Sequence, residues 1–389
     1  MIFGSELKAR WPLDPGCTYL NHGTVGVTPY AVLDAQQAIR LEIECQPAKF
    51  MDVDLRPRLR QAADRVAQVL GGAGDDYVFI ENASTGINAV LRGLDFEDGD
   101  EILYVSHAYG AVKKAIGYVA SRTGAIPVAI EIPYPPKNDE EILTPLKTAL
   151  NGNSKLAVLD HITSETALRL PIRRMAALCR AAGVPVLVDG AHAPAMSEID
   201  IPTLGATWYA GNLHKWMFAP RGCGVLWTDP GYQKTTHPLT ISWGYQESYI
   251  EEFAWTGTHD FSRYLAVPAA VDFMQELGES RMRLHNDALV REGASFVADA
   301  FGLTYQAPDN MTGAMTLIPL LESFGSSADE ASALRAILRD EHNIELHFIA
   351  LDDRIWGRVA AQVYNDMSDF EKLTDALRTV SARNESLIS

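Results

Sequence analysis

VLVDGAHAP (residues 186–194) begins as a short apolar strand and then places Asp189 at its end, followed by a glycine and His192. A strand without polar alternation is typical of a sheet that helices cover on both faces. A carboxylate buried at the strand end needs a partner, or its pKa rises until it is neutral. No second carboxylate lies close by, so no metal is expected. A protonated ring nitrogen of a ligand would satisfy Asp189, and a helix-capping role is the alternative.

The same alternation of apolar strands and amphipathic helices extends outward from this stretch. Helices are predicted at 111–124, 140–150 and 173–183, between strands at 77–80, 101–107, 126–132, 155–160, 184–189, 206–212 and 222–228. This order predicts an α/β fold with a largely parallel sheet. Ligands of such sheets bind at the carboxyl ends of the strands.

The pattern changes in the last third of the chain. An irregular stretch at 229–262 is followed by helical and strand segments in a βαββα-like order, which indicates a smaller α+β domain. We therefore expect a large domain over 16–260 and a small one over 261–389, with residues 1–15 packing on the small domain.

The composition excludes several classes of protein. The 389 residues carry a net charge of −17, which disfavours nucleic acid and anionic membranes as partners. The four cysteines form no CxxC pair, so neither a zinc site nor a disulfide framework is expected. The N-terminus lacks a signal-peptide pattern, and no apolar run reaches a membrane-spanning length. A cytoplasmic location is the expectation.

A lysine stands in an unusual setting in GNLHKWMFAP (211–220). Lys215 is followed directly by Trp216 and Met217, although lysine normally lies on a solvated surface. It is either a structural ion-pair partner or an amine that has been desolvated so that it can react as a nucleophile.

Polar groups follow the other strands. ENASTGIN places Ser84 where a helix begins, which suits either an anion site or a plain N-cap. SHAYG offers His107 and Tyr109 for stacking on a flat ring. DHITSETA offers hydrogen-bonding groups, among them Ser164. Taken singly, each of these side chains is more simply explained by a structural role.

Together, the strand ends supply an anion-binding helix N-terminus, a ring that can stack on a ligand, a buried carboxylate and a buried lysine. Pyridoxal 5'-phosphate (PLP) is the common cofactor that needs this combination. A nucleotide-dependent oxidoreductase is disfavoured because no GxGxxG follows an early strand. A non-catalytic protein on the same fold would be expected to lose Lys215 or Asp189.

Several motifs resemble those of one family: YLNHGTVGVTP (19–29), ENAST, HAYGA, DHITS, VDGAHAP, GNLHKW, APRGCG, WTGTHD (255–260) and RVAAQVYN (358–365). The chain is similar to the fold-type I PLP enzymes of the class V aminotransferase superfamily, and within it to the isopenicillin N epimerase-like branch. The resemblance implies a large domain with a mainly parallel seven-stranded sheet covered by helices and a smaller C-terminal α+β domain.

The resemblance also implies roles for the cofactor-binding residues. Lys215 would form the Schiff base with PLP, Asp189 would bind the pyridine nitrogen, and Tyr109 would stack on the ring, with His107 as the fallback. The remaining cofactor contacts would come from Ala83, Ser84, Ser164, His192, Asn212 and His214. Thr258 would reach the phosphate of a neighbouring subunit, which implies a homodimer.

On the substrate side, the resemblance implies that Arg358 binds the carboxylate of an amino acid while Asn21 and His22 line the site. Reprotonation at Cα from the opposite face, assisted by Tyr109, would make the protein an epimerase or racemase. Loss of a β-substituent would make it a C–S lyase, and transamination is the third outcome. Residues 340–358 contain no cysteine, so persulfide chemistry of the cysteine desulfurase kind is disfavoured.

Overall fold

The computed structural model describes residues 2–388, and the chain divides into two compact units. Unit 1 comprises residues 1–27, 165–169 and 277–389, and unit 2 comprises residues 28–164 and 170–276. The last crossing of the chain from one unit to the other lies at 276/277, later than the boundary expected near 260. Residues after 260 belong with unit 2 because the side chain of Gln36 donates a 3.1 Å hydrogen bond to Ser262, and Arg40 forms an ion pair with Asp260.

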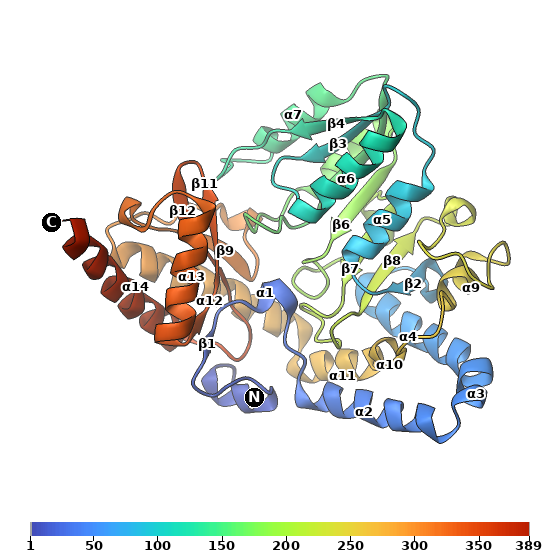
Figure 1. Ribbon diagram of the computed structural model, residues 1–389, viewed down its shortest axis with the longest axis horizontal. Helices are drawn as coiled ribbons and strands as arrows, with labels where there is room; N and C mark the ends of the chain where they lie inside the picture. Colours follow the sequence, from blue (N-terminus) through green and yellow to red (C-terminus); the bar gives the residue numbers. More distant parts are fainter. Residues whose placement is uncertain (1, 389) are drawn as a thin grey trace. The chain divides into compact units, whose positions relative to one another are not determined.

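The centre of unit 2 is one sheet with the strand order β2-β8-β7-β6-β5-β3-β4, seven strands within the described part of the chain (Figure 1). Its strands are β2 (Tyr77–Ile80), β3 (Glu101–Val105), β4 (Ile126–Ile130), β5 (Ser154–Asp160), β6 (Val186–Gly190), β7 (Trp208–Asn212) and β8 (Gly224–Thr228). Neighbouring strands are parallel from β7 to β4, whereas β8 is antiparallel to both β7 and β2. The expected α/β fold with a mainly parallel sheet is confirmed.

The register of the sheet aligns the carboxyl ends of its strands. Asp160 on β5 lies opposite Asp189 on β6, and Asp189 lies opposite Ala210 on β7. Because β8 is antiparallel to both β7 and β2, β2 runs in the same direction as β7. The segments that follow β2, β3, β5, β6 and β7 therefore all begin at one edge of the sheet.

Helices cover this sheet and extend unit 2. They are α2 (Tyr30–Cys45), α3 (Pro47–Lys49), α4 (Leu55–Leu70), α5 (Ala83–Gly93), α6 (Gly110–Thr123), α7 (Glu140–Ala149), α8 (Ile172–Ala181), α9 (Tyr249–Ala254), α10 (Ser262–Leu265) and α11 (Val267–Leu277). Ile87 of α5 and Ile116 of α6 share an apolar core with Leu187 of β6. All five residues of β6 are buried, as its apolar sequence predicted.

Unit 1 contains two small sheets within its described residues. Strand β1 (Thr18–Tyr19) pairs in parallel with β10 (Ile344–Glu345), and the second sheet has the order β11-β12-β9. The remaining elements are α1 (His22–Val25), α12 (Glu279–Ala300), β9 (Met315–Pro319), α13 (Ala328–His342), β11 (His347–Leu351), β12 (Arg354–Ala360) and α14 (Met367–Ile388). Helices α12, α13 and α14 pack with the sheet around one apolar core (Figure 1).

None of the helices within residues 2–388 combines the length and the apolar character needed to cross a membrane.

Candidate functional site

Asp189 ends β6 as a buried carboxylate. Its side chain is 5% exposed, and its Oδ1 accepts a 3.0 Å hydrogen bond from the backbone N–H of Ala191. Burial raises the pKa of Asp189, while that hydrogen bond and the positive charge of Lys215 act in the opposite direction. A buried carboxylate held at a strand end is suited to bind a protonated ring nitrogen.

Lys215 follows β7 and is buried, with 9% of its side chain exposed. Its Nζ lies 3.0 Å from Nε2 of His192, which follows β6, and the same Nε2 lies 3.4 Å from the hydroxyl of Ser164, which follows β5. Three segments of the chain thus meet around one imidazole. An amine in contact with an imidazole in a dry setting can exchange a proton with it.

The N-terminus of α5 lies beside the end of β7. Oδ1 of Asn212 accepts a 2.8 Å hydrogen bond from the backbone N–H of Ala83, and Oδ1 of Asn82 accepts from Thr85 N–H as the helix N-cap. Ser84, between these two positions, is half-buried. The positive end of the helix dipole and the Ser84 hydroxyl are the groups that such a terminus offers an anion.

His214 is held by the strand next to it. Its Nδ1 donates a 2.8 Å hydrogen bond to the backbone carbonyl of Cys223. Burial lowers the pKa of His214 to about 4, although that hydrogen bond raises it. The ring is therefore neutral near pH 7, and its contact with a phosphate would be a hydrogen bond rather than an ion pair.

The two candidate ring-stacking residues differ in exposure. His107, just after β3, is buried, with its ring centroid 6.4 Å from that of Tyr134. Tyr109 is 45% exposed and occupies the N-cap of α6. Thr258 is exposed, in the segment that follows α9. The burial of His107 makes it the better preorganised of the two rings.

A close backbone approach occurs at the end of β6. A Cβ at Gly190 would lie 2.1 Å from Cε1 of Tyr209, so only glycine fits against that ring. The hydroxyl of Tyr209 lies 3.0 Å from Nδ1 of His161. The close contact between Gly190 and Tyr209 therefore holds the end of β6, which carries Asp189, against β7.

Arg358 lies on β12 in unit 1 and is buried, with 4% of its side chain exposed. Its Nη2 donates a 2.8 Å hydrogen bond to the hydroxyl of Thr24. Burial and the charge of Arg335 lower the pKa of Arg358 to about 10, and the charge of Glu165 raises it. The guanidinium remains charged at pH 7 and keeps the fork that binds a carboxylate.

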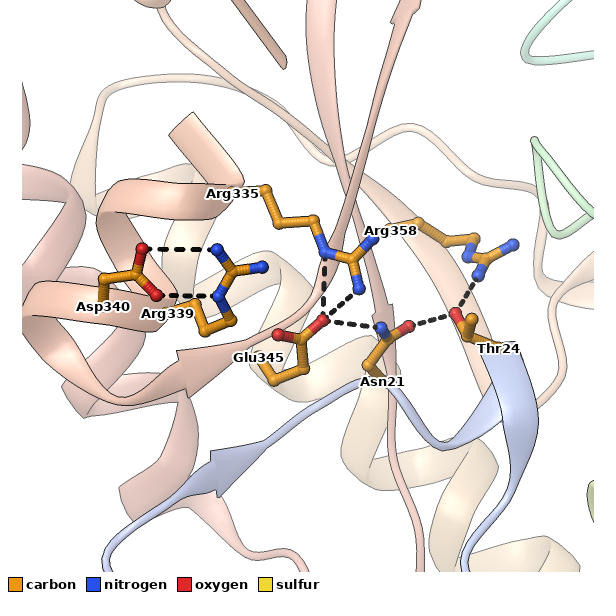
Figure 2. Close-up of polar contacts among 7 residues, drawn as sticks. All are labelled: Asn21, Thr24, Arg335, Arg339, Asp340, Glu345 and Arg358. Carbon is orange, nitrogen blue, oxygen red and sulfur yellow. Dashed lines mark hydrogen bonds and ion pairs between the residues drawn. The ribbon is translucent and has the colours of Figure 1, made fainter. Parts of the chain in front are cut away.

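The two N-terminal residues expected on the substrate side have partners in unit 1. The amide of Asn21 bonds Glu345 at 3.2 Å and Thr24 at 2.5 Å (Figure 2). Nδ1 of His22 lies 2.8 Å from the hydroxyl of Tyr364, and His22 is fully buried. These contacts make the two side chains parts of the structure of unit 1, and a direct contact of either with substrate stays a prediction.

Sequence reasoning missed Thr24, Glu345 and Arg335. Thr24 falls inside the motif NHGTVG, but nothing in a short motif shows that its partner is an arginine 334 positions later. Glu345 and Arg335 follow no expected strand end of the large domain. The pairing of β1 with β10 brings the N-terminal segment to Glu345, and the bridge between Asn21 and Ala360 of β12 brings it to Arg358.

The donor set of unit 2 fits PLP. The buried carboxylate of Asp189 suits the pyridine nitrogen, and the buried amine of Lys215 suits the aldehyde. The charge of Lys215 acts on the Asp189 carboxyl, so the two groups share one electrostatic environment. The N-terminus of α5 suits the phosphate.

Known proteins resemble the chain over most of its length. The L-cysteine desulfhydrase of Arabidopsis thaliana is 31% identical, with 93% of this chain and 87% of the relative covered. The isopenicillin N epimerase of Streptomyces clavuligerus is 28% identical, with 96% and 97% covered. A solved structure of the enzyme C-DES, a variant with glycine covalently linked to its PLP cofactor, shares the fold with a TM-score of 0.80 at 22% identity, with 95% of this chain and 98% of that chain covered.

The sequence profile named Aminotransferase class-V matches residues 25–336. That range includes Asp189, Lys215 and the N-terminus of α5. The chain belongs to the class-V aminotransferase family, a family of PLP-dependent enzymes, as the resemblance of its motifs implied.

Proposed function

We propose that this protein is a PLP-dependent lyase that removes a β-substituent, through its C–S bond, from an amino acid of the cysteine type. The observation that carries the proposal is the 3.0 Å contact between Nζ of Lys215 and Nε2 of His192. Elimination needs one group to take the Cα proton and a proton source for the departing sulfur, and this pair can supply both. The cysteine desulfhydrase relative supports the same reaction class.

PLP, when bound, supplies a carbonyl group for the substrate amine and an electron sink for the charge that forms at Cα. The chain's own groups do the rest. Neutral Nζ of Lys215 takes the Cα proton, and the Cβ–S bond then breaks with its electron pair on sulfur. The imidazole of His192 exchanges protons with Nζ and so protonates the leaving sulfur. With L-cysteine and one water the products are sulfide, pyruvate and ammonia.

The cofactor contacts are part of the same proposal. Asp189 holds a proton on the ring nitrogen, while Ser84, Asn212, His214 and the backbone of Ala83 bind the phosphate. His107 stacks on the ring, with Tyr109 as the alternative. In a homodimer, Thr258 reaches the phosphate bound by the neighbouring subunit. Arg358 binds the substrate carboxylate. The free state of all four cysteines supports a reducing, cytoplasmic setting.

Epimerisation is the second candidate. It requires a proton carrier on the face of Cα opposite Lys215, and the phenol of Tyr109, 45% exposed at the start of α6, is the candidate group. The isopenicillin N epimerase relative supports this outcome.

The test is an incubation of the PLP-loaded enzyme in D2O with L- and D-amino acids, including S-substituted cysteines. Mass spectrometry measures α-deuterium, chiral chromatography measures inversion, and pyruvate is assayed in parallel. We expect pyruvate without inversion. Deuterium with inversion and no keto acid would instead establish the epimerase and point to Tyr109 as the second proton carrier.

A further inference from the structure

A continuous line of hydrogen bonds in unit 1, the relay, connects Arg358 with Thr24, Asn21, Glu345 and Arg335 (Figure 2). Nη2 of Arg358 donates to Oγ1 of Thr24 at 2.8 Å, and that hydroxyl donates to Oδ1 of Asn21 at 2.5 Å. Nδ2 of Asn21 then donates to Oε1 of Glu345 at 3.2 Å. Nε of Arg335 donates to the same Glu345 oxygen at 3.0 Å.

The bonds from Arg358 to Glu345 all point the same way. A hydroxyl has one hydrogen, and the hydrogen of Thr24 is used by Asn21, so only its lone pairs face Arg358. The amide of Asn21 can serve both neighbours in one orientation, with its NH2 group toward Glu345 and its oxygen toward Thr24. The carboxylate of Glu345 ends the line as an acceptor and thereby fixes the direction of every bond in it.

The backbone holds this line in place. Leu20 N–H donates to the carbonyl of Glu345 at 2.9 Å, and Ala360 N–H donates to the carbonyl of Leu20 at 2.8 Å. Residue Asn21 itself forms a parallel bridge with Ala360. The N-terminal segment is thus fixed between β10, which carries Glu345, and β12, which carries Arg358.

We propose that Thr24, Asn21 and Glu345 are positioning residues that orient the Arg358 guanidinium for the carboxylate of the amino acid substrate. This inference rests on the proposed role of Arg358. A guanidinium binds a carboxylate through two parallel bonds, so rotation of its plane loses one of them. With one Nη of Arg358 tied to Thr24, the plane of the fork is set before substrate arrives, which lowers the ordering cost of binding.

These hydrogen bonds give Asn21 a different role from the one expected of it. Both ends of its amide are engaged within unit 1, and its side chain is 2% exposed. Asn21 acts through Thr24 and Arg358 rather than by touching the substrate.

The probes are L-alanine and L-alaninamide, which share the α-amine but differ in the carboxylate. Neither carries a β-leaving group, so the PLP-loaded enzyme binds both without elimination. Titration of the cofactor absorption band gives a dissociation constant for each, and the change in their ratio from one variant to the next reports the carboxylate interaction. We expect Thr24→Val to reduce the preference for L-alanine about tenfold, the effect of losing one good hydrogen bond to a charged group.

Two comparisons separate positioning from general loss of structure. Thr24→Ser restores the hydroxyl and is expected to recover most of the preference. Thr374→Val makes the same substitution at a buried threonine of α14, whose hydroxyl bonds the carbonyl of Phe370, and should leave the preference as in the wild type. An equal loss of affinity for both ligands in Thr24→Val would overturn the inference.

The far end of the line offers a second test that does not touch Thr24. Arg335→Gln removes the charged partner of Glu345 and should reduce the preference in the same direction but by less. Arg339→Gln, one turn further along α13 in an exposed ion pair with Asp340, is the matched control (Figure 2). An unchanged preference in both Thr24→Val and Arg335→Gln would refute the relay.

A failure of the role proposed for Arg358 would give a different result. If Arg358 does not bind the substrate carboxylate, wild-type enzyme and Arg358→Leu show the same preference for L-alanine. If Arg358→Leu abolishes the preference while Thr24→Val keeps it, Arg358 is assigned correctly and only the relay is wrong.

Discussion

Nζ of Lys215 lies 3.0 Å from Nε2 of His192, and the two residues come from segments that follow adjacent parallel strands. The contact exists because β6 and β7 end at the same edge of the sheet. The contact pairs the Lys215 amine, which is expected to remove the Cα proton, with the His192 imidazole, which can carry a proton.

We therefore predict that His192→Gln, which keeps a hydrogen-bonding side chain but cannot carry a proton, lowers kcat about 100-fold, a usual contribution of acid–base catalysis. The measurement is the rate of keto-acid formation at saturating substrate. The control is His161→Gln, because His161 follows β5 but pairs with Tyr209. Equal rates in the two variants would remove His192 from proton transfer.

A second prediction concerns Asp189→Asn. Burial raises the pKa of this carboxyl above its unfolded value, so its contribution to apoprotein stability is lost as pH rises from about 4 through the folded pKa. The amide of Asp189→Asn does not titrate, so the variant does not lose stability as pH rises in this range. Apoprotein Asp189→Asn should therefore melt no lower than wild-type apoprotein at pH 8. It should also lose most of the Tm increase that PLP gives the wild type, because the neutral amide cannot pair with a pyridinium. An undiminished Tm increase with PLP would show that Asp189 does not bind the ring.

Much of unit 2 could be predicted because its signals are local. The strand VLVD and its neighbours are apolar without interruption, and the helices between them are amphipathic, so β6, α5 and α6 were predicted to within a few residues. The candidate site was expected at the edge where these strand ends meet, and Lys215 and His192 are in contact there.

The relay in unit 1 could not be predicted in this way. It depends on the pairing of Tyr19 with Glu345, which joins two-residue strands that no periodicity reveals. The partner of Thr24 is set by where β12 lies beside the N-terminal segment, and sequence patterns carry no such information. The helix α9 inside the stretch expected to be irregular was missed for a similar reason, since it has only six residues.

A third prediction follows from His214. Burial lowers the pKa of its ring to about 4, below the unfolded value near 6.5. The unfolded chain therefore binds a proton first as pH falls, and stability that is complete above pH 6.5 decreases as pH approaches 4. The loss should reach about 3 kcal/mol for this one group. Urea unfolding of apoprotein between pH 7 and 4 should show a shallower pH dependence in His214→Gln, and an identical dependence would contradict the assignment.

A fourth prediction tests the support beneath Asp189. Alanine at Gly190 would place its Cβ 2.1 Å from the Tyr209 ring, so either the ring or β6 must move. We expect Gly190→Ala to lower the free energy of unfolding by about 3 kcal/mol, at the upper end for overpacking, since the ring is buried on all sides. The control is Gly117→Ala within α6, where a Cβ meets no atom within 4 Å and alanine should stabilise the helix by about 0.5–1 kcal/mol. Urea unfolding measures both, and Gly190→Ala should cost less in a Tyr209→Leu background than in the wild type, because the smaller side chain removes the clash. If Gly190→Ala costs the same free energy of unfolding in the two backgrounds, contact with Tyr209 is not what requires glycine at this position.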